Sequence, residues 1–285
     1  MAESLFFGEA EQKDIPACEA LFFCCFGAAE EGKLVLRQQG GFRIFCVKEK
    51  ERIVAMLTAM PVSVTAGEEQ LSAVYLYGIA THPEKRGEGL CTALMEYVHH
   101  TMAGEGTSLF LLVPSTPQNR IFYGKRGYRD CSWLCRGEVS ASKVESPLLA
   151  EPIDSAEYKT LRARFCPTSR MDWGTEGLAF QQEWLRLYGG GFWRFGSREE
   201  PCGCAALNQE ENNYFVRELL TAPQQIDAAL AALNAKLNAA TLSYCLAQEQ
   251  GTARGFIPQP FAMRYDTSPE SRRRVPELYV NLALD

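Results

Sequence analysis

Two glycines between a predicted strand and a predicted helix form the most informative segment of the sequence. The segment reads Val74-Tyr-Leu-Tyr-Gly-Ile-Ala-Thr-His-Pro-Glu-Lys-Arg-Gly-Glu-Gly-Leu-Cys91. The first turn of a helix presents backbone N–H groups that have no internal partner, and the helix dipole adds positive charge there. Glycine lets a phosphate approach the backbone closely, and Arg86 adds a cation. The residue types therefore fit a pyrophosphate-binding turn, although two glycines alone more often serve only the turn itself.

A second segment places an amide and a phenol on one helix face. Asn119 and Tyr123 lie four residues apart in a short predicted helix that opens at Thr116-Pro117 and stops at Gly127. Side chains at this spacing project from the same face. Taken alone, Tyr123 is most simply a core aromatic.

These segments are positioned by alternating strands and helices. Apolar periodicity in the first half predicts a helix from Asp14, a hairpin of strands, a third strand, a helix from Leu90 and a buried strand. Those strands lie at 42–47, 53–60, 74–81 and 109–113, with closing strand material at 133–140. In the second half, helices are predicted at 155–165, 176–187 and 226–237, and strands at 192–195, 203–207, 214–220, 242–246, 261–265 and 278–284.

The second half repeats the order of the first: hairpin, strand, helix, strand. We interpret the chain as a diverged internal duplication. Residues from about 141 to 153 lack clear periodicity, which places the domain boundary there. The predicted domains are residues 1–145 and 146–285, in line with a length of 285 residues.

The two motifs resemble those of the GNAT (N-acetyltransferase) superfamily. Its motif A corresponds to Arg86-Gly-Glu-Gly89-Leu-Cys91, with Cys91 where the family has Gly or Ala, and its motif B corresponds to the segment from Asn119 through Phe122-Tyr123. The resemblance covers about residues 4–140. It implies an α/β fold with a mixed, mostly antiparallel sheet whose central parallel strands splay apart. The second half looks like a degenerate GNAT-like domain, as in tandem members of the superfamily.

The resemblance also implies acetyl-CoA as co-substrate and direct transfer of its acetyl group to a primary amine of a small molecule or peptide. Tyr123 is the implied general acid. The implied cofactor-binding residues are Ile79, Ala80, Thr81, Arg86, Gly87, Glu88, Gly89, Leu90, Cys91, Thr92 and Asn119. Acceptor specificity is expected in loops at 27–41 and 171–174. The alternative function is an acyl-CoA-binding sensor without turnover, which would need no leaving-group acid.

The sequence offers no clear proton acceptor for the amine. Tyr75 and Tyr77 lie on the cofactor strand, where family members often carry a glutamate or a water relay. His82 lies beside the predicted phosphate turn, too far from the thioester. His99 and His100 come late on a helix, where solvated or capping roles are expected.

Two carboxylates of the second half remain open as candidates. Glu218 could bind a cationic acceptor, but pairing with an arginine is the more common state of a half-buried carboxylate. The last residue, Asp285, could bring a terminal carboxylate into the core, where it would need a partner.

Composition excludes several other classes. A net charge of −6 and a pI of about 5.4 argue against a nucleic-acid surface. Eleven cysteines, an odd number mostly inside apolar runs, favour reduced buried thiols over disulfides or a metal site. No signal peptide and no apolar stretch of roughly 20 residues is present, so we expect a cytoplasmic protein without a membrane partner.

Overall fold

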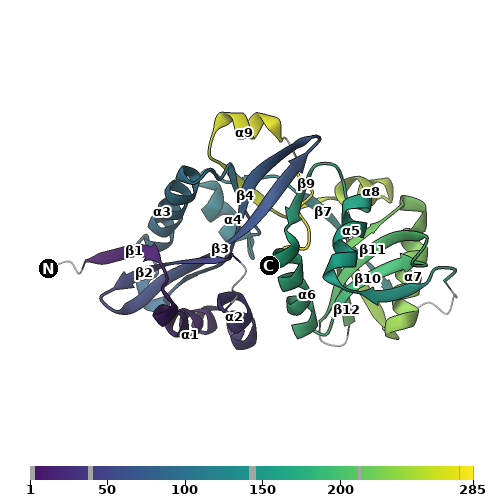
Figure 1. The fold of residues 1–285 in the computed structure, drawn as a ribbon, viewed down its shortest axis with the longest axis horizontal. Coiled ribbons are helices and arrows are strands. Elements are labelled where there is room, and N and C mark those ends of the chain that lie inside the picture. Colours follow the sequence, from purple (N-terminus) through teal and green to yellow (C-terminus); the bar gives the residue numbers. More distant parts are fainter. Residues whose placement is uncertain (1–3, 38–40, 141–145, 211–212, 276, 285) are drawn as a thin grey trace.

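The computed structural model describes residues 4–37, 41–140, 146–210, 213–275 and 277–284. They form two mixed sheets that lie side by side in Figure 1. In spatial order, the first sheet contains β1 (Leu5–Glu9), β2 (Arg43–Glu49), β3 (Arg52–Ala66), β4 (Glu69–Thr81), β5 (Leu109–Leu112), β15 (Met263–Asp266) and β6 (Arg129–Asp130), and β9 (Arg170–Trp173) pairs with β3. The second contains β14 (Gln259–Pro260), β7 (Trp133–Ser140), β13 (Thr241–Ala247), β12 (Asn213–Thr221), β11 (Pro201–Glu210), β10 (Gly191–Gly196) and β8 (Ala150–Ile153).

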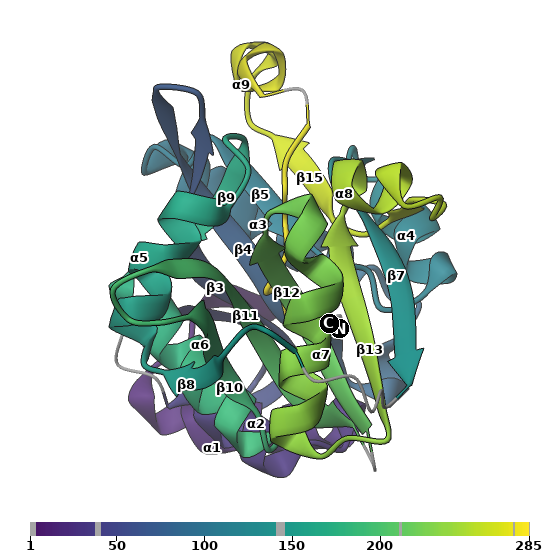
Figure 2. The ribbon, with the colours of Figure 1, turned by 90° about the vertical axis from the view of Figure 1, so that its right-hand side faces the viewer.

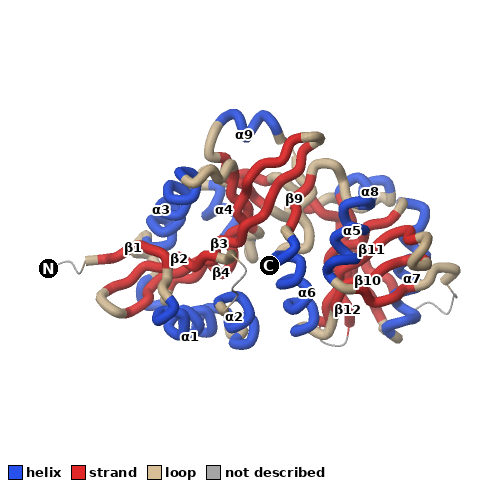
Figure 3. The backbone as a smooth tube through the Cα atoms, in the orientation of Figure 1, coloured by secondary structure: helices blue, strands red, loops and turns tan. Residues whose placement is uncertain are grey.

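Helices cover both faces of the first sheet (Figure 3). One face packs on α3 (Leu90–Gly104) and α4 (Pro117–Gly124), and the other on α1 (Ile15–Phe26) and α2 (Ala29–Leu36). The second sheet is accompanied by α5 (Ser155–Phe165), α6 (Thr175–Leu187), α7 (Ile226–Leu237) and α8 (Gln248–Ala253), and α9 (Pro269–Arg274) follows β15. No helix in the described ranges is both long and apolar enough to span a bilayer.

The α2 helix corrects one expectation. Residues 27–41 were predicted to form a loop, but 29–36 are helical. A Cβ at Gly32 would lie 2.9 Å from the Phe22 ring, so the glycine permits close packing of α2 on α1. Similarly, the predicted loop 171–174 contributes residues 171–173 to strand β9, which pairs with the far end of β3.

The parallel strands β4 and β5 pair over only three residues, Ala73–Tyr75 with Leu109–Leu111. Beyond that point β4 continues to Thr81 while β5 stops at Leu112, so the strands separate as predicted. A β-bulge adds one residue to β4 between Tyr77 and Ala80, opposite Met56 and Thr58 of β3. Gly78 adopts φ 59° at this bulge, a left-handed conformation that favours glycine. The open wedge and the bulge lie next to each other.

The two sheets have the same strand order, and each contains at least one strand from the other half of the chain. In the second sheet β12 and β13 again form a three-residue parallel ladder, and β12 carries a bulge opposite Ala206 and Leu207. Strand β7 leaves the first half to pair with β13, and β15 leaves the second half to pair with β5 (Figure 2). The boundary at 145/146 stays a prediction, since residues 141–145 lie outside the described ranges and each sheet contains a strand from the other half.

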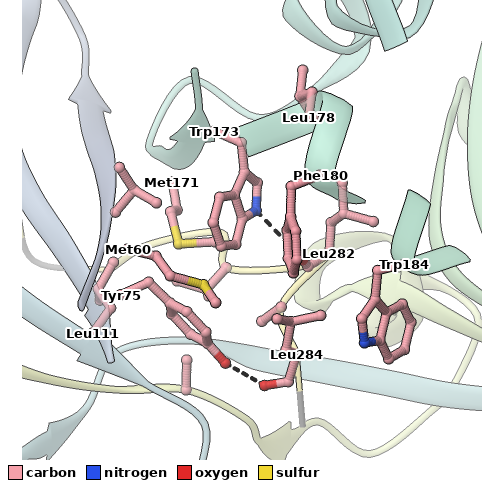
Figure 4. Close-up of a cluster of buried hydrophobic side chains, with 14 of the residues drawn as sticks. Met60, Tyr75, Leu111, Met171, Trp173, Leu178, Phe180, Trp184, Leu282 and Leu284 are labelled. Atoms are coloured by element: carbon pink, nitrogen blue, oxygen red, sulfur yellow. Dashed lines mark hydrogen bonds between the residues drawn. The ribbon is translucent and has the colours of Figure 1, made fainter. Parts of the chain in front are cut away.

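The prediction of a strand at 278–284 was wrong. The segment forms only an isolated bridge between Tyr279 and Arg170, and Leu282 has a positive φ of 54°, which interrupts an extended ladder. Its apolar side chains are buried between the two sheets (Figure 4). The Trp173 Nε1–H donates to the Leu282 carbonyl at 3.1 Å, and the Tyr75 hydroxyl donates to the Leu284 carbonyl. Asp285 lies outside the described residues.

His99 is a partly buried core residue, not the solvated or capping residue that was expected. Its ring stacks on Tyr265 with centroids 4.3 Å apart, and Nε2 lies 2.7 Å from the Tyr128 hydroxyl. Burial lowers the pKa of His99 from 6.5 to about 4. His100 is exposed.

The burial of His99 predicts that the folded protein becomes less stable in acid. Because the folded-state pKa of His99 is depressed, protonation favours the unfolded chain, and stability is lost as pH falls from about 6.5 toward 4. We expect this group to lower the free energy of unfolding by on the order of 2 kcal/mol over that interval. Chemical denaturation at several pH values should show a shallower dependence for His99→Gln than for the wild type. If the free energy of unfolding depends on pH equally in both proteins, His99 does not cause the acid sensitivity.

Candidate active site

A cavity of about 590 Å³ lies at the end of β4, beyond the residues that pair with β5. Its walls come from the end of α1, the end of β4, the turn before α3, the first turn of α3, and α4. Every residue predicted to bind the cofactor, except Glu88, lines this space, as does Tyr123. The motifs that the sequence separates by about thirty residues are thus brought to one site.

The turn before α3 has the geometry of an anion site. Gly87 and Gly89 have φ values of 86° and 80°, and a Cβ added to either would meet nothing within 4 Å. The N–H of Ala93 donates to the Gly89 carbonyl at 3.0 Å in the first helical bond of α3. The N–H groups of the residues before Ala93 therefore have no helical acceptor and are open to a ligand. The space beside the turn and its free donors fit a pyrophosphate.

Basic side chains surround the same turn. Arg86 Nε donates to the Thr81 carbonyl at 3.3 Å, and among the described residues Arg86 has no carboxylate partner. Lys85 pairs with Glu49 at 2.5 Å and lies 3.9 Å from Glu88, whose side chain is outside the cavity wall. A guanidinium without an acid partner at the mouth of a cavity can pair bidentately with a phosphate.

Tyr123 and Asn119 face the cavity from α4. The Asn119 N–H donates to the Thr116 hydroxyl at 3.1 Å, which caps the helix, and Asn119 Nδ2 donates to Ser115 Oγ at 2.9 Å. Tyr123 is 8% exposed, and within the described ranges its hydroxyl has no hydrogen-bond partner. Burial raises the pKa of Tyr123, and the neighbouring Cys91 raises it further. The phenol therefore stays protonated at neutral pH and can donate into the cavity.

Several wall residues were missed in the sequence. Phe122 and Arg126 line the cavity, and the Arg126 guanidinium lies 3.4 Å from the centroid of the Phe122 ring. Arg126 Nε also donates to Thr92 Oγ1 at 2.7 Å, which links the turn after α4 to α3. Its nearness to Tyr123 in the sequence, three residues away, could have indicated its place. Cys25 and Phe26 of α1 could not be inferred, since they meet this site only through tertiary packing.

The corresponding wedge in the second sheet is bridged by a side chain. Gln250, the third residue of α8, donates from Nε2 to the Thr221 carbonyl at the end of β12 at 2.9 Å. Asn119 is likewise the third residue of α4 in the first half. The turn after Thr221 has no glycine, and Thr221 Oγ1 contacts Gln225 at 3.2 Å. These contacts lie at the place that corresponds to the mouth of the first-half cavity.

Glu218 pairs with an arginine, which was the more common of the two states considered for it. It is fully buried, and Arg162 Nε lies 2.8 Å from its carboxylate. Tyr158 also donates to the same carboxylate. The pKa of Arg162 is raised by Glu218 despite its burial. The pair is a structural ion pair rather than an open acceptor site.

The cysteines are free thiols, and six of them are buried: Cys18, Cys46, Cys131, Cys135, Cys204 and Cys245. Burial raises the pKa of Cys91, beside the cavity, to about 11. A protonated thiol is a poor nucleophile. In the part of the chain that the structure describes, no group of three or more His, Cys, Asp or Glu side chains could hold a metal ion.

Comparison with known proteins gives a sequence match in the first half of the chain and similar folds over most of its length. Residues 8–131 match the sequence profile of the acetyltransferase (GNAT) domain. A search of curated proteins by sequence gives no match. A protein from Enterococcus faecalis V583, described as a probable N-acyltransferase, superposes with a TM-score of 0.74 at 13% identity, over 94% of this chain and 74% of that one.

Two further structures extend this comparison. A GCN5-related N-acetyltransferase from Kribbella flavida has a TM-score of 0.68 at 16% identity, over 92% of this chain and 70% of that one. A tandem GNAT protein from the clavulanic acid biosynthesis pathway has a TM-score of 0.55 at 10% identity, over 93% and 99% of the two chains.

At these identities the structures share a fold, and that fold is the α/β architecture of GNAT N-acyltransferases in a two-domain arrangement. The sequence match to the GNAT acetyltransferase domain lies in the first half of the chain, at residues 8–131.

Proposed function

We propose that the protein is an N-acetyltransferase that moves the acetyl group of acetyl-CoA directly to a primary amine of a small molecule or peptide. The observation that carries this proposal is the cavity enclosed by the end of β4, the turn before α3 and α4. It combines a glycine turn with open backbone donors, an arginine without an acid partner, and a buried protonated phenol. The second half, with the predicted bounds 146–285, then acts as a degenerate GNAT-like domain that shapes the acceptor side.

In this proposal, most residues of the cavity bind acetyl-CoA, and Tyr123 transfers a proton. The turn at Gly87–Gly89 and the first N–H groups of α3 would hold the pyrophosphate, with Arg86 beside them. The open edge of β4 at Ile79–Thr81 and the Asn119 amide would align the pantetheine arm. Acetyl-CoA supplies the activated thioester when bound. Tyr123 would donate its proton at the sulfur position, and the surrounding apolar rings exclude water.

A turnover assay tests the proposal. Release of free CoA should depend on both acetyl-CoA and an amine, and an equal amount of acetylated amine should form. Mass spectrometry of the acceptor is preferable to thiol reagents because the chain carries eleven cysteines. Binding of acetyl-CoA without acetylation of any amine in a broad panel would instead favour the sensor function.

The bridged wedge in the second sheet predicts the binding stoichiometry. We expect one CoA per chain, since Gln250 closes the second wedge and the turn after Thr221 lacks glycine. Isothermal titration with CoA should saturate at one equivalent. Saturation at two equivalents would show that the second half retains a working site.

A further inference from the structure

Glu31, on α2, differs from the other buried carboxylates of the protein. Among the described residues three acidic side chains are buried: Asp14, Glu31 and Glu218. Lys48 pairs with Asp14 at 2.6 Å, and Arg162 pairs with Glu218. Glu31 is 7% exposed, and within the described ranges no basic side chain pairs with it. A buried carboxylate without a cation is costly unless something else compensates it.

Two tyrosine hydroxyls hold the Glu31 carboxylate from the two halves of the chain. The Tyr77 hydroxyl, from β4, donates to Oε1, and the Tyr188 hydroxyl, at the end of α6, donates to Oε2. Burial and the Glu31 charge raise the pKa of Tyr77, and burial with the Glu31 hydrogen bond raises that of Tyr188. Both phenols therefore remain donors. They orient the carboxylate but do not neutralise its charge.

The surroundings of Glu31 are aromatic. The Tyr77 ring lies 6.3 Å from that of Phe22, and the Tyr188 ring lies 4.7 Å from that of Trp184. The nearby Arg217 guanidinium lies 4.6 Å over Trp184 and forms its ion pair with Glu210 at 3.9 Å. A carboxylate framed by aromatic faces matches the chemistry of an organic cation, which gains from both charge and cation–π contact.

The Glu31 cluster lies next to the cavity. Tyr77 directly precedes the Gly78 bulge, and the next residue, Ile79, lines the cavity. Phe22 joins the two places, because its ring lies 4.7 Å from that of Phe26 in the cavity wall. Tyr77 and Tyr188 are each half-buried, whereas Glu31 is buried behind them. Helices α2 and α6 face each other there in Figure 1.

We propose that Glu31 is the binding site for a second cationic group of the acceptor, so that the preferred acceptors are diamines or polyamines. The inference rests on the proposed acetyl transfer at the neighbouring cavity. One amine would reach the thioester past the β4 bulge while the other ammonium group pairs with Glu31. This gives the second half a defined part in recognition, because Tyr188 completes the carboxylate site from α6.

Binding measurements test this site without requiring turnover. The CoA-bound protein is titrated calorimetrically with cadaverine and its longer and shorter homologues, each paired with the monoamine of equal length. We expect diamines to bind more tightly than the matching monoamines. Glu31→Gln keeps the shape and removes the charge; one tyrosine can still donate to the amide oxygen, and the other can accept from the amide nitrogen. It should weaken diamine binding by about 10- to 100-fold. Monoamine binding and CoA binding should change little.

Matched variants separate recognition from folding. Glu30→Gln removes an exposed carboxylate one residue away, which pairs with Lys33, and should leave diamine binding unchanged. Tyr188→Phe keeps the Glu31 charge and removes one donor, so a weaker loss specific to diamines is expected even if Glu31→Gln folds poorly. Wild-type protein that binds no diamine, or equal losses for diamines and monoamines in Glu31→Gln, would overturn the site.

Kinetics distinguish this inference from failure of the proposed function. In turnover, Glu31→Gln should raise KM for diamines and leave kcat nearly unchanged. A fall in kcat for every amine, with a shifted pH profile, would mean that Glu31 accepts the amine proton and would contradict the binding role. Diamine binding that depends on Glu31 in a protein without acetyl transfer would refute the proposed function alone.

Discussion

Replacing Tyr123 with phenylalanine is expected to lower kcat by about 10²–10⁴. The leaving group is a thiolate whose conjugate acid has a pKa near roughly 8.5, close to that of free cysteine. Burial raises the pKa of Tyr123, so the phenol carries its proton throughout the neutral range. It can hydrogen-bond the sulfur and transfer that proton as the C–S bond breaks. No loss of activity from deprotonation of Tyr123 is therefore expected between mildly acidic and mildly basic pH.

The phenylalanine variant retains the ring, which contacts Phe122 and Tyr128 with centroid distances of 5.3 and 5.8 Å. Melting temperature and acetyl-CoA affinity should therefore change little, so the loss would fall on kcat. Tyr128→Phe is a useful control, since Tyr128 is buried against His99 outside the cavity wall. Near-normal kcat for Tyr123→Phe across this pH range would make Tyr123 a packing residue, with water protonating the thiolate.

Gly89→Val is expected to weaken acetyl-CoA binding by roughly ten-fold or more. The side chain would occupy the open space beside the turn, between the backbone donors and an approaching phosphate. Valine also disfavours the φ of 80° that Gly89 adopts. Calorimetry on the folded variant measures the loss.

A second glycine supplies the control for backbone strain. Gly255 has φ 85°, and a Cβ there would also meet nothing within 4 Å, but it follows α8 outside the cavity wall. Gly255→Val should therefore show comparable strain with unchanged acetyl-CoA affinity. If Gly89→Val binds acetyl-CoA as tightly as the wild type, the assignment of the turn to the cofactor fails.

Local sequence signals were sufficient for most elements of the fold. The N-cap Asp14 and Gly27 bracket α1, and the predicted helices at 155–165 and 226–237 have the bounds of α5 and α7. Signals that depend on distant partners were not sufficient. The exchange of β7 and β15 between the sheets is a tertiary choice, because either strand would satisfy the same local pattern. The segment 278–284 was apolar enough to suggest a strand, yet it is buried without a ladder.

In the candidate site too, local signals were sufficient for some residues and not for others. The residues of the glycine turn and of α4 could be placed because their spacing along the chain specifies their geometry, and they do line one cavity. Their roles in cofactor binding stay predictions. The Glu31 cluster had no local signal, since its carboxylate and two phenols come from α2, β4 and the end of α6. Only the packing of the two halves brings these groups together.

The most direct test of the account follows the acetyl group itself. The wild-type protein is incubated with acetyl-CoA that carries an isotopically labelled acetyl group and with a diamine, and mass spectrometry tracks the label over the first turnovers. The account predicts label on an acceptor nitrogen in amounts equal to the free CoA formed, and none on the protein. Label on a cysteine of the chain before it reaches the amine, or CoA release without labelled amine, would contradict direct transfer at this site.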